Sequence, residues 1–322
     1  MTALVQAEGL RRSFGDLTAV DDVSLSVEAG QVLALLGPDG AGKTTTIRLL
    51  CGALKADAGR VILAGYDLAS QTEDARAQIG YLPQRFSLYG ELTVLENLQF
   101  FADVRGLPRD EWLPRSREML TFVGLAEFAD RRAEALSGGM KQKLGLAAAM
   151  VHQPRILLLD EPTGGVDPVT RQSFWQLLIR VLRQGVAVVL STPYMDEASR
   201  CSRVGFLLRG RLLVEGSPEE MTRPLQGRVI ELIAQPQRAV EAIVRQDRSV
   251  EDVQVFGDRL HLRLAPGSTE QITAALRQRI ELDGGRVEQI RTVVPGLEDA
   301  FIELLQRHMA TPGVGLGTET KS

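Results

Sequence analysis

A glycine-rich turn between an apolar strand and a helix constrains the fold of this chain more than any other feature. The strand runs from Val32 to Leu36, and apolar residues at helical spacing follow the turn. Glycines in such a turn let successive backbone N–H groups point at an anion, and the helix N-terminus adds positive potential. The turn and the first helical residues are Gly37, Pro38, Asp39, Gly40, Ala41, Gly42, Lys43, Thr44 and Thr45. This pattern predicts phosphate binding, and therefore a nucleotide site.

Two side chains at the end of this turn have distinct chemical uses. The ammonium group of Lys43 can reach the outer phosphates of a nucleotide, and the hydroxyl of Thr44 suits Mg²⁺. A bare glycine-rich turn is the alternative interpretation. The strand before the turn and the helix after it make that alternative the weaker one.

A second chemical signal is a pair of carboxylates after a strongly apolar strand. Ile156 to Leu159 lead directly into Asp160 and Glu161. In a parallel sheet, ligands bind at the carboxyl ends of the strands, where phosphates would lie. Asp160 could then belong to the Mg²⁺ shell, and Glu161 could accept a proton from the water that attacks the γ-phosphate. The alternative is an acidic strand end without a chemical role.

Composition limits the classes of protein to be considered. The chain has 322 residues, 44% of them hydrophobic and 24% charged, which is enough for a large core and two domains. The formal net charge of −4 gives no reason to expect a nucleic-acid-binding face. Cys51 and Cys201 lack metal-ligand spacing, so we expect free buried thiols in a reducing cytoplasm. No apolar run is long enough to span a bilayer, so a membrane role would need a partner chain.

The order of apolar patterns predicts an α/β fold for residues 1–218. Short strand-like runs, among them Leu4 to Ala7 and Val23 to Val27, precede the phosphate loop and indicate an antiparallel β-subdomain. A helical pattern then predicts an inserted helical subdomain at about 85–150, with a capping box that begins at Thr93. Continuous apolar strands alternate with helices after it, as in a parallel sheet covered on both faces. Asp167 at the cap and Pro168 at the first position begin one of these helices.

The pattern changes after Pro218. Strands are expected at 229–233, 253–256, 259–264 and 287–294, and helices at 237–245 and 269–282, in the order β-α-β-β-α-β. A final helix carries Leu297, Phe301, Ile302 and Leu305 on one stripe. Residues 225–308 are therefore predicted to form a small α+β domain, and residues 309–322 a disordered tail.

A third signal lies between the phosphate loop and the paired carboxylates. A helix N-cap with exposed backbone N–H groups is predicted at Ser137, Gly138 and Gly139. This would be a second helix N-terminus that can bind an anion. Alone, this tripeptide is more often a cap and turn. With the other two signals in this order, residues 1–218 resemble the ATP-binding cassette (ABC) ATPases, which have a P-loop ATPase core.

This resemblance implies roles for further residues. Gln84 matches the glutamine that senses Mg²⁺ and the attacking water, although a lone glutamine after a strand could be a solvated loop residue. Asp167 matches the loop that crosses to a second ATPase domain, besides capping its helix. Phe14 matches the aromatic that stacks on adenine, with a structural aromatic as the alternative. ATP and Mg²⁺ are the implied cofactors, and the Ser137 loop would complete the nucleotide site of a second cassette.

One position departs from the family pattern. Pro193 stands where the family usually has a histidine that contacts the γ-phosphate. Proline donates no hydrogen bond through its side chain or its backbone nitrogen. We therefore expect this site to hydrolyse ATP slowly or only to bind it. A partner ATPase that carries the histidine could then supply a complete site.

The segment from Pro295 to Phe301 resembles the carboxyl-terminal motif of bacterial drug-resistance-type exporter ATPases. The alternative interpretation is an amphipathic helix that seals the small domain.

The resemblance to this family implies an ATP-hydrolysing subunit that powers a membrane exporter through nucleotide-driven dimerisation. It would act at the cytoplasmic face of the inner membrane, with permease subunits on separate chains and a second cassette, identical or different. A non-hydrolysing partner, an importer ATPase and a nucleic-acid-associated cassette protein are the alternatives. The last is opposed by the absence of a basic face in the sequence.

Overall fold

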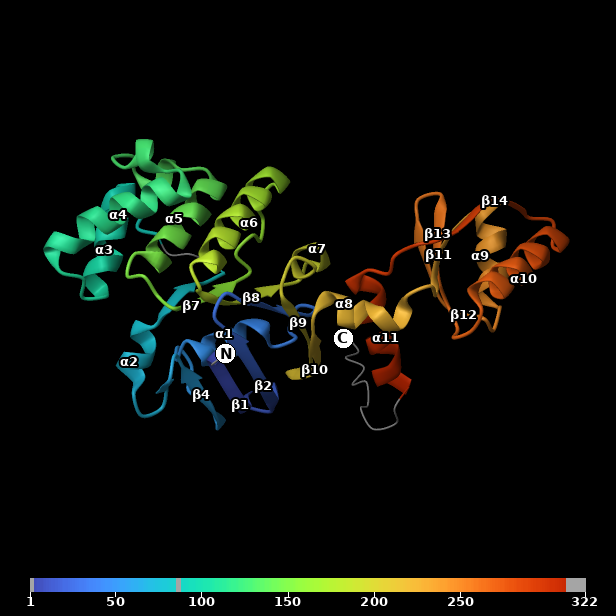
Figure 1. Ribbon diagram of the computed structural model, residues 1–322, viewed down its shortest axis with the longest axis horizontal. Coiled ribbons are helices and arrows are strands. Elements are labelled where there is room, and N and C mark those ends of the chain that lie inside the picture. The colour runs from blue at the N-terminus through green and yellow to red at the C-terminus, as the bar shows by residue number, and fades with distance from the viewer. Residues whose placement is uncertain (1–2, 85–87, 311–322) are drawn as a thin grey trace, which may run out of the picture. The chain divides into compact units, whose positions relative to one another are not determined.

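The computed structural model describes residues 3–84 and 88–310 and divides into two compact units, Met1–Ser217 and Pro218–Ser322. Figure 1 labels the helices and strands of both. The boundary lies where the alternating strands and helices of the nucleotide-binding pattern end.

A six-stranded sheet forms the centre of the first unit, in the order β10-β9-β3-β8-β7-β6. The strands are β3 (Val32–Leu36), β6 (Ile79–Leu82), β7 (Ile156–Asp160), β8 (Ala187–Thr192), β9 (Arg203–Leu208) and β10 (Arg211–Gly216). Neighbouring strands are parallel except for β10, which pairs antiparallel with β9. Every residue of β3, β7 and β8 is buried, so the predicted parallel sheet covered on both faces is confirmed.

A second sheet, in the order β2-β1-β4-β5, makes the expected antiparallel β-subdomain. Its strands are β1 (Ala3–Phe14), β2 (Leu17–Glu28), β4 (Ala58–Leu63) and β5 (Tyr66–Asp67). β1 and β2 each have 12 residues, much longer than the short runs that we expected. The pairing of β1 with β2 shifts register between Ala7 and Leu10 and again beyond Leu10. Such bulges interrupt the alternation of apolar and polar side chains, so the sequence pattern divides one strand into fragments.

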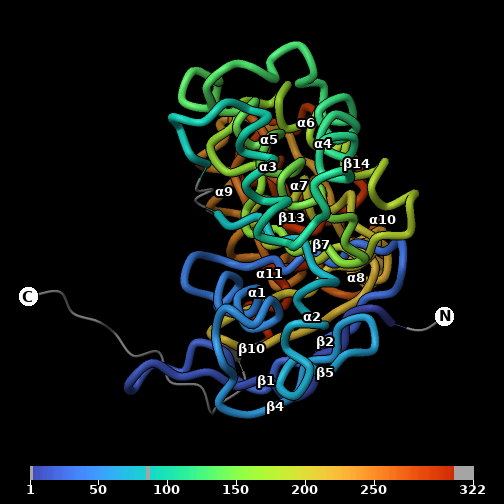
Figure 2. The backbone as a smooth tube through the Cα atoms, turned by 90° about the vertical axis from the view of Figure 1, so that its left-hand side faces the viewer, coloured from blue at the N-terminus to red at the C-terminus, as the bar shows by residue number. Residues whose placement is uncertain are grey.

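Helices α3 (Val94–Val104), α4 (Arg109–Val123) and α5 (Gly138–Met150) form the predicted helical subdomain. Figure 2 shows it at one end of the first unit, in green, with the β-subdomain in blue at the other. The expected capping box is present: Glu96 N donates to Thr93 Oγ1 at 3.2 Å, and Thr93 N donates to Glu96 Oε2 at 2.7 Å. The first unit also contains α1 (Lys43–Leu50), α2 (Thr72–Ala77), α6 (Pro168–Arg183) and α7 (Met195–Ala198).

Four parallel strands end at the same edge of the central sheet. β3 leads into the glycine-rich loop, β7 ends at Asp160, β8 ends at Thr192, and Gln84 follows β6 by two residues. The register pairs Leu36 with Thr192 and Asp160 with Ser191, so these ends lie level with one another. This edge is the expected ligand-binding edge of an open α/β sheet.

The second unit has the predicted β-α-β-β-α-β order, followed by a final helix. It consists of α8 (Pro218–Thr222), β11 (Val229–Gln235), α9 (Gln237–Arg245), β12 (Val250–Phe256), β13 (Arg259–Leu264), α10 (Thr269–Leu282), β14 (Arg286–Thr292) and α11 (Leu297–Ala310). Its antiparallel sheet has the order β12-β13-β11-β14. Strands β11 and β13 pack with α9 and α10 around a core of their own, which includes Leu232, Val240, Leu262 and Leu276.

Polar contacts attach α11 to this sheet. His261 Nε2 lies 2.9 Å from Asp299 Oδ1, and Gly296 N donates to Asp299 Oδ2 at 2.7 Å. The hydrogen bond with Asp299 raises the pKa of His261, which favours an ion pair. α11 extends to Ala310, so residues 309 and 310, which we assigned to the tail, belong to the helix. The rest of the predicted tail, residues 311–322, lies outside the described residues.

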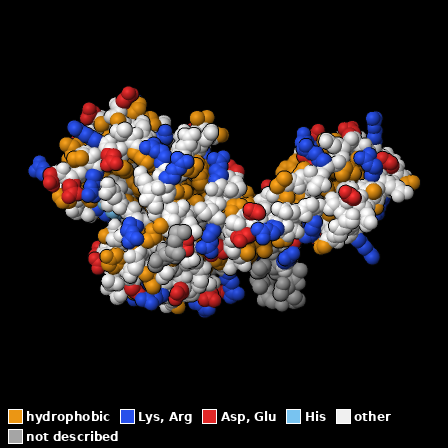
Figure 3. All heavy atoms as spheres, viewed as in Figure 1, with side chains coloured by type: hydrophobic (Ala, Val, Ile, Leu, Met, Phe, Trp, Pro, Cys, Tyr) orange, Lys and Arg blue, Asp and Glu red, His pale blue; other side chains and the backbone are white. Residues whose placement is uncertain are grey.

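The cysteines, the helix lengths and the surface charge all bear on what composition predicts. Cys51 and Cys201 are free and buried, as predicted. No helix in the described part of the chain is long and apolar enough to cross a membrane. On the face of the first unit drawn in Figure 3, basic and acidic side chains are interspersed.

Candidate functional site

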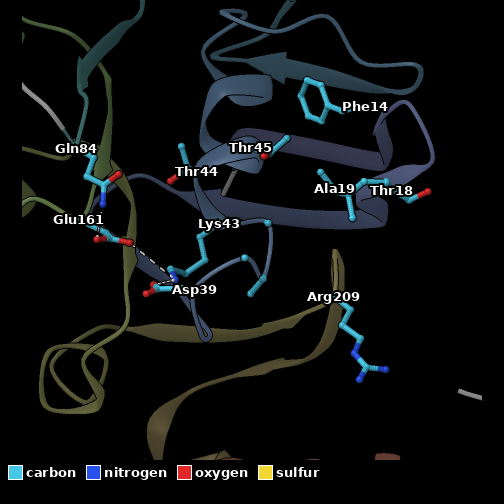
Figure 4. Close-up of a pocket in the computed structure, with 14 residues that line it drawn as sticks. Phe14, Thr18, Ala19, Asp39, Lys43, Thr44, Thr45, Gln84, Glu161 and Arg209 are labelled. Carbon is cyan, nitrogen blue, oxygen red and sulfur yellow. Dashed lines mark hydrogen bonds and ion pairs between the residues drawn. The ribbon is translucent and has the colours of Figure 1, made fainter. Parts of the chain in front are cut away.

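A pocket of about 600 Å³ opens beside the glycine-rich loop (Figure 4). Its lining comes from the loop, from β1 and β2, and from the carboxyl-end edge of the central sheet. The lining residues are Phe14, Leu17, Thr18, Ala19, Asp39, Gly40, Ala41, Gly42, Lys43, Thr44, Thr45, Gln84, Glu161 and Arg209. The tertiary structure thus brings together Phe14, the loop, Gln84 and Glu161, which are widely separated in the sequence.

The backbone of the loop is fixed by close contacts. Gly42 has φ 102, and a β-carbon on it would lie 2.4 Å from Ala19 O. A β-carbon on Gly37 would lie 2.2 Å from Leu207 O. Both positions require glycine because the contacting atoms are backbone. The loop is therefore held in place by the strands behind it.

Lys43 is buried, with 4% of its side chain exposed. Its Nζ donates to Gly37 O at 2.8 Å and to Pro38 O at 3.0 Å, and lies 3.8 Å from Glu161 Oε1. Asp39 Oδ1 lies 4.0 Å from the same nitrogen, so the ammonium group is held by the loop carbonyls and by two carboxylates. Phosphate oxygens are stronger acceptors than these carbonyl groups because they are charged.

Asp160 has the geometry of a metal ligand. Its Oδ1 accepts hydrogen bonds from Thr44 Oγ1 at 2.9 Å and from Ser191 Oγ at 2.6 Å. Its Oδ2 is buried and has no hydrogen-bond partner among the described residues. A buried, unpartnered carboxylate oxygen beside a hydroxyl fits Mg²⁺, which binds oxygen ligands and usually takes one or two carboxylates besides phosphate.

Glu161 is held in a specific orientation at the edge of the sheet. Its backbone has φ 47, a left-handed conformation that is strained for a residue with a β-carbon. Glu161 N donates to Ser191 Oγ at 2.9 Å, and Gln84 Nε2 donates to Glu161 Oε2 at 2.8 Å. The carboxylate therefore faces Lys43 on one side and Gln84 on the other (Figure 4).

The pocket lining does not include the predicted site residues Ser137, Gly138, Gly139 and Asp167. Ser137 caps α5 and accepts from Met140 N at 3.3 Å, which leaves Gly138 and Gly139 in the first turn of that helix. Asp167 caps α6 and accepts from Val169 N and Thr170 N, both at 3.0 Å. The expected caps are present, and the functions assigned to these residues depend on a second cassette.

Phe14 lies at the opposite side of the pocket from Glu161 (Figure 4). The residue is 44% exposed, and the Arg12 guanidinium carbon lies 4.9 Å from the ring centroid. An exposed aromatic face at the rim of a phosphate pocket can stack on a base.

The sequence did not identify several contributors. Leu17, Thr18 and Ala19 reach the pocket because β2 pairs with β1, and Arg209 does so because Gly210 N donates to Ala41 O at 2.9 Å. Ser191, which contacts both carboxylate residues, is likewise positioned by the pairing of β8 with β7. No local pattern marks such residues, since their roles come from strand pairing.

Known proteins resemble this chain in sequence and in fold. Residues 20–164 match the protein family described as ABC transporter. A solved structure described as the ATP-binding subunit of an ABC transporter has a TM-score of 0.63 and 30% sequence identity, and covers 69% of this chain and 93% of that one. A dimeric bacterial ABC transporter cassette has a TM-score of 0.59 and 28% sequence identity. The match covers 66% of this chain and 98% of that one. The predicted P-loop ATPase fold is confirmed.

Curated relatives extend the similarity through the second unit. The probable multidrug ABC transporter ATP-binding protein YbhF of Escherichia coli is 38% identical over 309 residues, which cover 94% of this chain. The match covers 52% of YbhF, so this chain spans about half the length of that relative. The linearmycin resistance ATP-binding protein LnrL of Bacillus subtilis is 32% identical over 94% of this chain and 99% of its own length. The Nod factor export ATP-binding protein I of a Rhizobium species is 36% identical over 95% of this chain and 98% of its own length. This chain therefore belongs to the ATP-binding proteins of the ABC transporter family.

Proposed function

We propose that this chain binds ATP with Mg²⁺ and hydrolyses it to ADP and phosphate. The observation that carries the proposal is the convergence of Lys43, Asp160 and Glu161 at one edge of the sheet, with Glu161 Oε1 3.8 Å from Lys43 Nζ. Lys43 binds the outer phosphates, and Thr44 and Asp160 hold Mg²⁺ with Gln84 nearby. The ion, when bound, neutralises charge on the phosphate oxygens. Glu161 accepts the proton of the attacking water, with Gln84 orienting its carboxylate.

We further propose that two cassettes sandwich the nucleotide. Ser137, Gly138 and Gly139 present the N-terminus of α5 outside the pocket, where it can complete the site of a second cassette. Asp167 begins α6 and would cross the same interface. ATP binding then closes the dimer and hydrolysis releases it, which gives a conformational cycle driven by differential affinity. The dimeric cassette among the similar structures supports this arrangement.

The proposed role of this cycle is export. The relatives are described as multidrug, linearmycin resistance and Nod factor export proteins, and their similarity includes the second unit. The chain would work at the cytoplasmic face of the inner membrane with permease subunits on other chains and with an identical or different second cassette.

A second candidate is a nucleotide-gated partner that hydrolyses ATP slowly or not at all. Pro193 follows β8 at the edge where the phosphates would lie, and its side chain offers no hydrogen-bond donor. A catalytic partner cassette would then supply most of the turnover.

Steady-state ATP turnover and ATP binding by the purified chain test the proposal, beside Glu161→Gln. We expect measurable Mg²⁺-dependent turnover in the wild type. In Glu161→Gln we expect unchanged ATP binding, loss of turnover and a dimer on gel filtration with ATP and Mg²⁺. ATP binding without turnover in the wild type would favour the second candidate. Failure to bind ATP would contradict both.

A further inference from the structure

A buried carboxylate outside the pocket connects the segments that carry the proposed catalytic residues. Glu197, in the short helix α7, has 1% of its surface exposed. It accepts hydrogen bonds from the hydroxyl groups of Thr163 and Thr192, the latter at 2.7 Å. Both threonines are buried as well, at 2% and 1% exposure. Arg171 Nε lies 3.5 Å from the same carboxylate.

Thr163 holds the turn that carries Glu161. It lies two residues after Glu161, and Gly164 N donates to Glu161 O at 3.0 Å across this turn. The hydrogen bond from Thr163 therefore fixes one side of the turn to Glu197.

Thr192 holds the neighbouring strand end. It is the last residue of β8 and follows Ser191, which accepts from Glu161 N and donates to Asp160. Thr192 Oγ1 also accepts from Tyr194 N at 3.0 Å, across Pro193. Glu197 thus joins the turn that follows Glu161 to the strand end that accepts a hydrogen bond from the Glu161 backbone N–H.

We propose that Glu197, acting through Thr163 and Thr192, is a positioning residue that fixes the Glu161 carboxylate for catalysis. The inference rests on the proposed ATP hydrolysis. Glu161 has a strained φ of 47, and a strained backbone persists only where the surrounding structure determines it strongly. Pro193 provides no side-chain hydrogen bond, and β8 contacts this site through the hydroxyl groups of Ser191 and Thr192 and through the carbonyl of Ser191, which accepts from Glu161 N at 3.2 Å.

A buried carboxylate is costly to retain, so its partners matter. Burial of an ionised carboxylate is unfavourable unless it is paired and hydrogen-bonded. Glu197 has two hydroxyl donors and Arg171, whose guanidinium carbon also lies 4.5 Å from the Tyr194 ring centroid. Arg171 belongs to α6, the helix capped by Asp167, so the cluster also connects that helix to the turn at Glu161.

Glu197→Gln, Thr163→Val and Thr192→Val test the proposal in the full chain. Each keeps the approximate shape of the side chain and removes a charge or a hydroxyl. We expect kcat to fall about tenfold or more, since small misplacements of catalytic groups have effects of this size. The KM and Kd for ATP should change less than about twofold, because direct nucleotide contacts remain. Thr121→Val, which removes a hydroxyl bonded within α4, is the matched control and should leave kcat unchanged.

A double-mutant comparison separates positioning from a merely structural role. If Glu197 acts through the two threonines, then Glu197→Gln should not lower kcat further in a Thr163→Val, Thr192→Val background. Unchanged kcat in the three single variants of an active wild type would overturn the positioning role. So would a parallel loss of ATP affinity, kcat and thermal stability. If Glu197→Gln fails to fold, the two threonine variants decide the matter. A wild type that binds ATP without turnover would instead contradict the proposed function.

Discussion

Thr44 Oγ1 donates a 2.9 Å hydrogen bond to Asp160 Oδ1, although 116 residues separate them in the sequence. The bond joins the helix that follows the phosphate loop to the end of β7. It leaves Asp160 Oδ2 buried and without a partner among the described residues. Two oxygen groups are thus held close together before any cation binds, so little reorganisation would be needed for Mg²⁺.

Thr44→Val should selectively weaken ATP binding in the presence of Mg²⁺. Valine has a similar shape but lacks the hydroxyl, so Asp160 loses a donor and the cation loses a ligand. We expect the Kd for ATP with Mg²⁺ to rise about tenfold or more, which corresponds to roughly 1.4 kcal/mol. Titration of ATP with Mg²⁺ and with EDTA measures this. Thr44→Ser retains the hydroxyl and should bind like the wild type; equal Kd values for the two variants would argue against a metal role.

Pro193→His should raise ATP turnover. Histidine can donate a hydrogen bond to a phosphate oxygen, which proline cannot do. Donors aimed at developing charge affect kcat by about a hundredfold or more in other enzymes, so an increase of about tenfold is a conservative expectation. Pro193→Ala, which removes the ring without adding a donor, serves as the control. Equal kcat values for the histidine and alanine variants would refute the idea that Pro193 limits hydrolysis.

Gly139→Ala should lower thermal stability, whereas Gly138→Ala should not. A β-carbon on Gly139 would lie 2.4 Å from Thr170 Cγ2, and Thr170 Oγ1 donates to Asp167 Oδ2 at 2.6 Å. The substitution therefore disturbs the cap of α6, at a cost of about 1–3 kcal/mol for overpacking. A β-carbon on Gly138 meets no atom within 4 Å.

Melting temperatures from circular dichroism compare the two alanine variants. Gly138→Ala should match or slightly exceed the wild type, since alanine restricts the unfolded chain. A Gly139→Ala protein as stable as Gly138→Ala would contradict the predicted contact with Thr170.

Protonation of His152 should lower the free energy of unfolding in mild acid. Burial, together with the charge of Arg105, lowers the pKa of His152 to about 4. Its Nε2 lies 3.0 Å from Ile79 O, a carbonyl that can only accept, so the neutral ring carries its proton on Nε2. In the unfolded chain His152 binds a proton at a pH near 6.5, whereas in the folded chain it does so only near 4. The free energy of unfolding is therefore at its full value above about pH 6.5. It falls between pH 6.5 and pH 4, by up to about 3 kcal/mol.

Urea unfolding between pH 7.5 and 4.5 measures this dependence. His152→Phe cannot titrate, so the difference in unfolding free energy between wild type and variant should shrink as the pH falls. A difference that stays constant over this range would mean that His152 does not contribute to acid destabilisation.

Local patterns in the sequence were sufficient for most of the fold. The glycines and Lys43 of the phosphate loop, the capping box at Thr93 and the cap at Asp167 follow from residue types at fixed spacing. The α+β order of the second unit follows from apolar periodicity. The prediction of strand length was wrong where irregular strand pairing interrupts the alternation of apolar and polar residues. In β1, bulges divide the sequence pattern of a 12-residue strand into shorter runs.

The site itself was only partly accessible from the sequence. The motifs identified the residue types, and the resemblance to ABC ATPases added Phe14 and Gln84. Their meeting in one pocket, the bond of Ser191 to Asp160 and the buried cluster at Glu197 were decided by the tertiary structure. The physical reason is that these contacts depend on which strands are neighbours and in what register. Sequence periodicity encodes which side chains are buried, whereas strand order and register determine which of them meet.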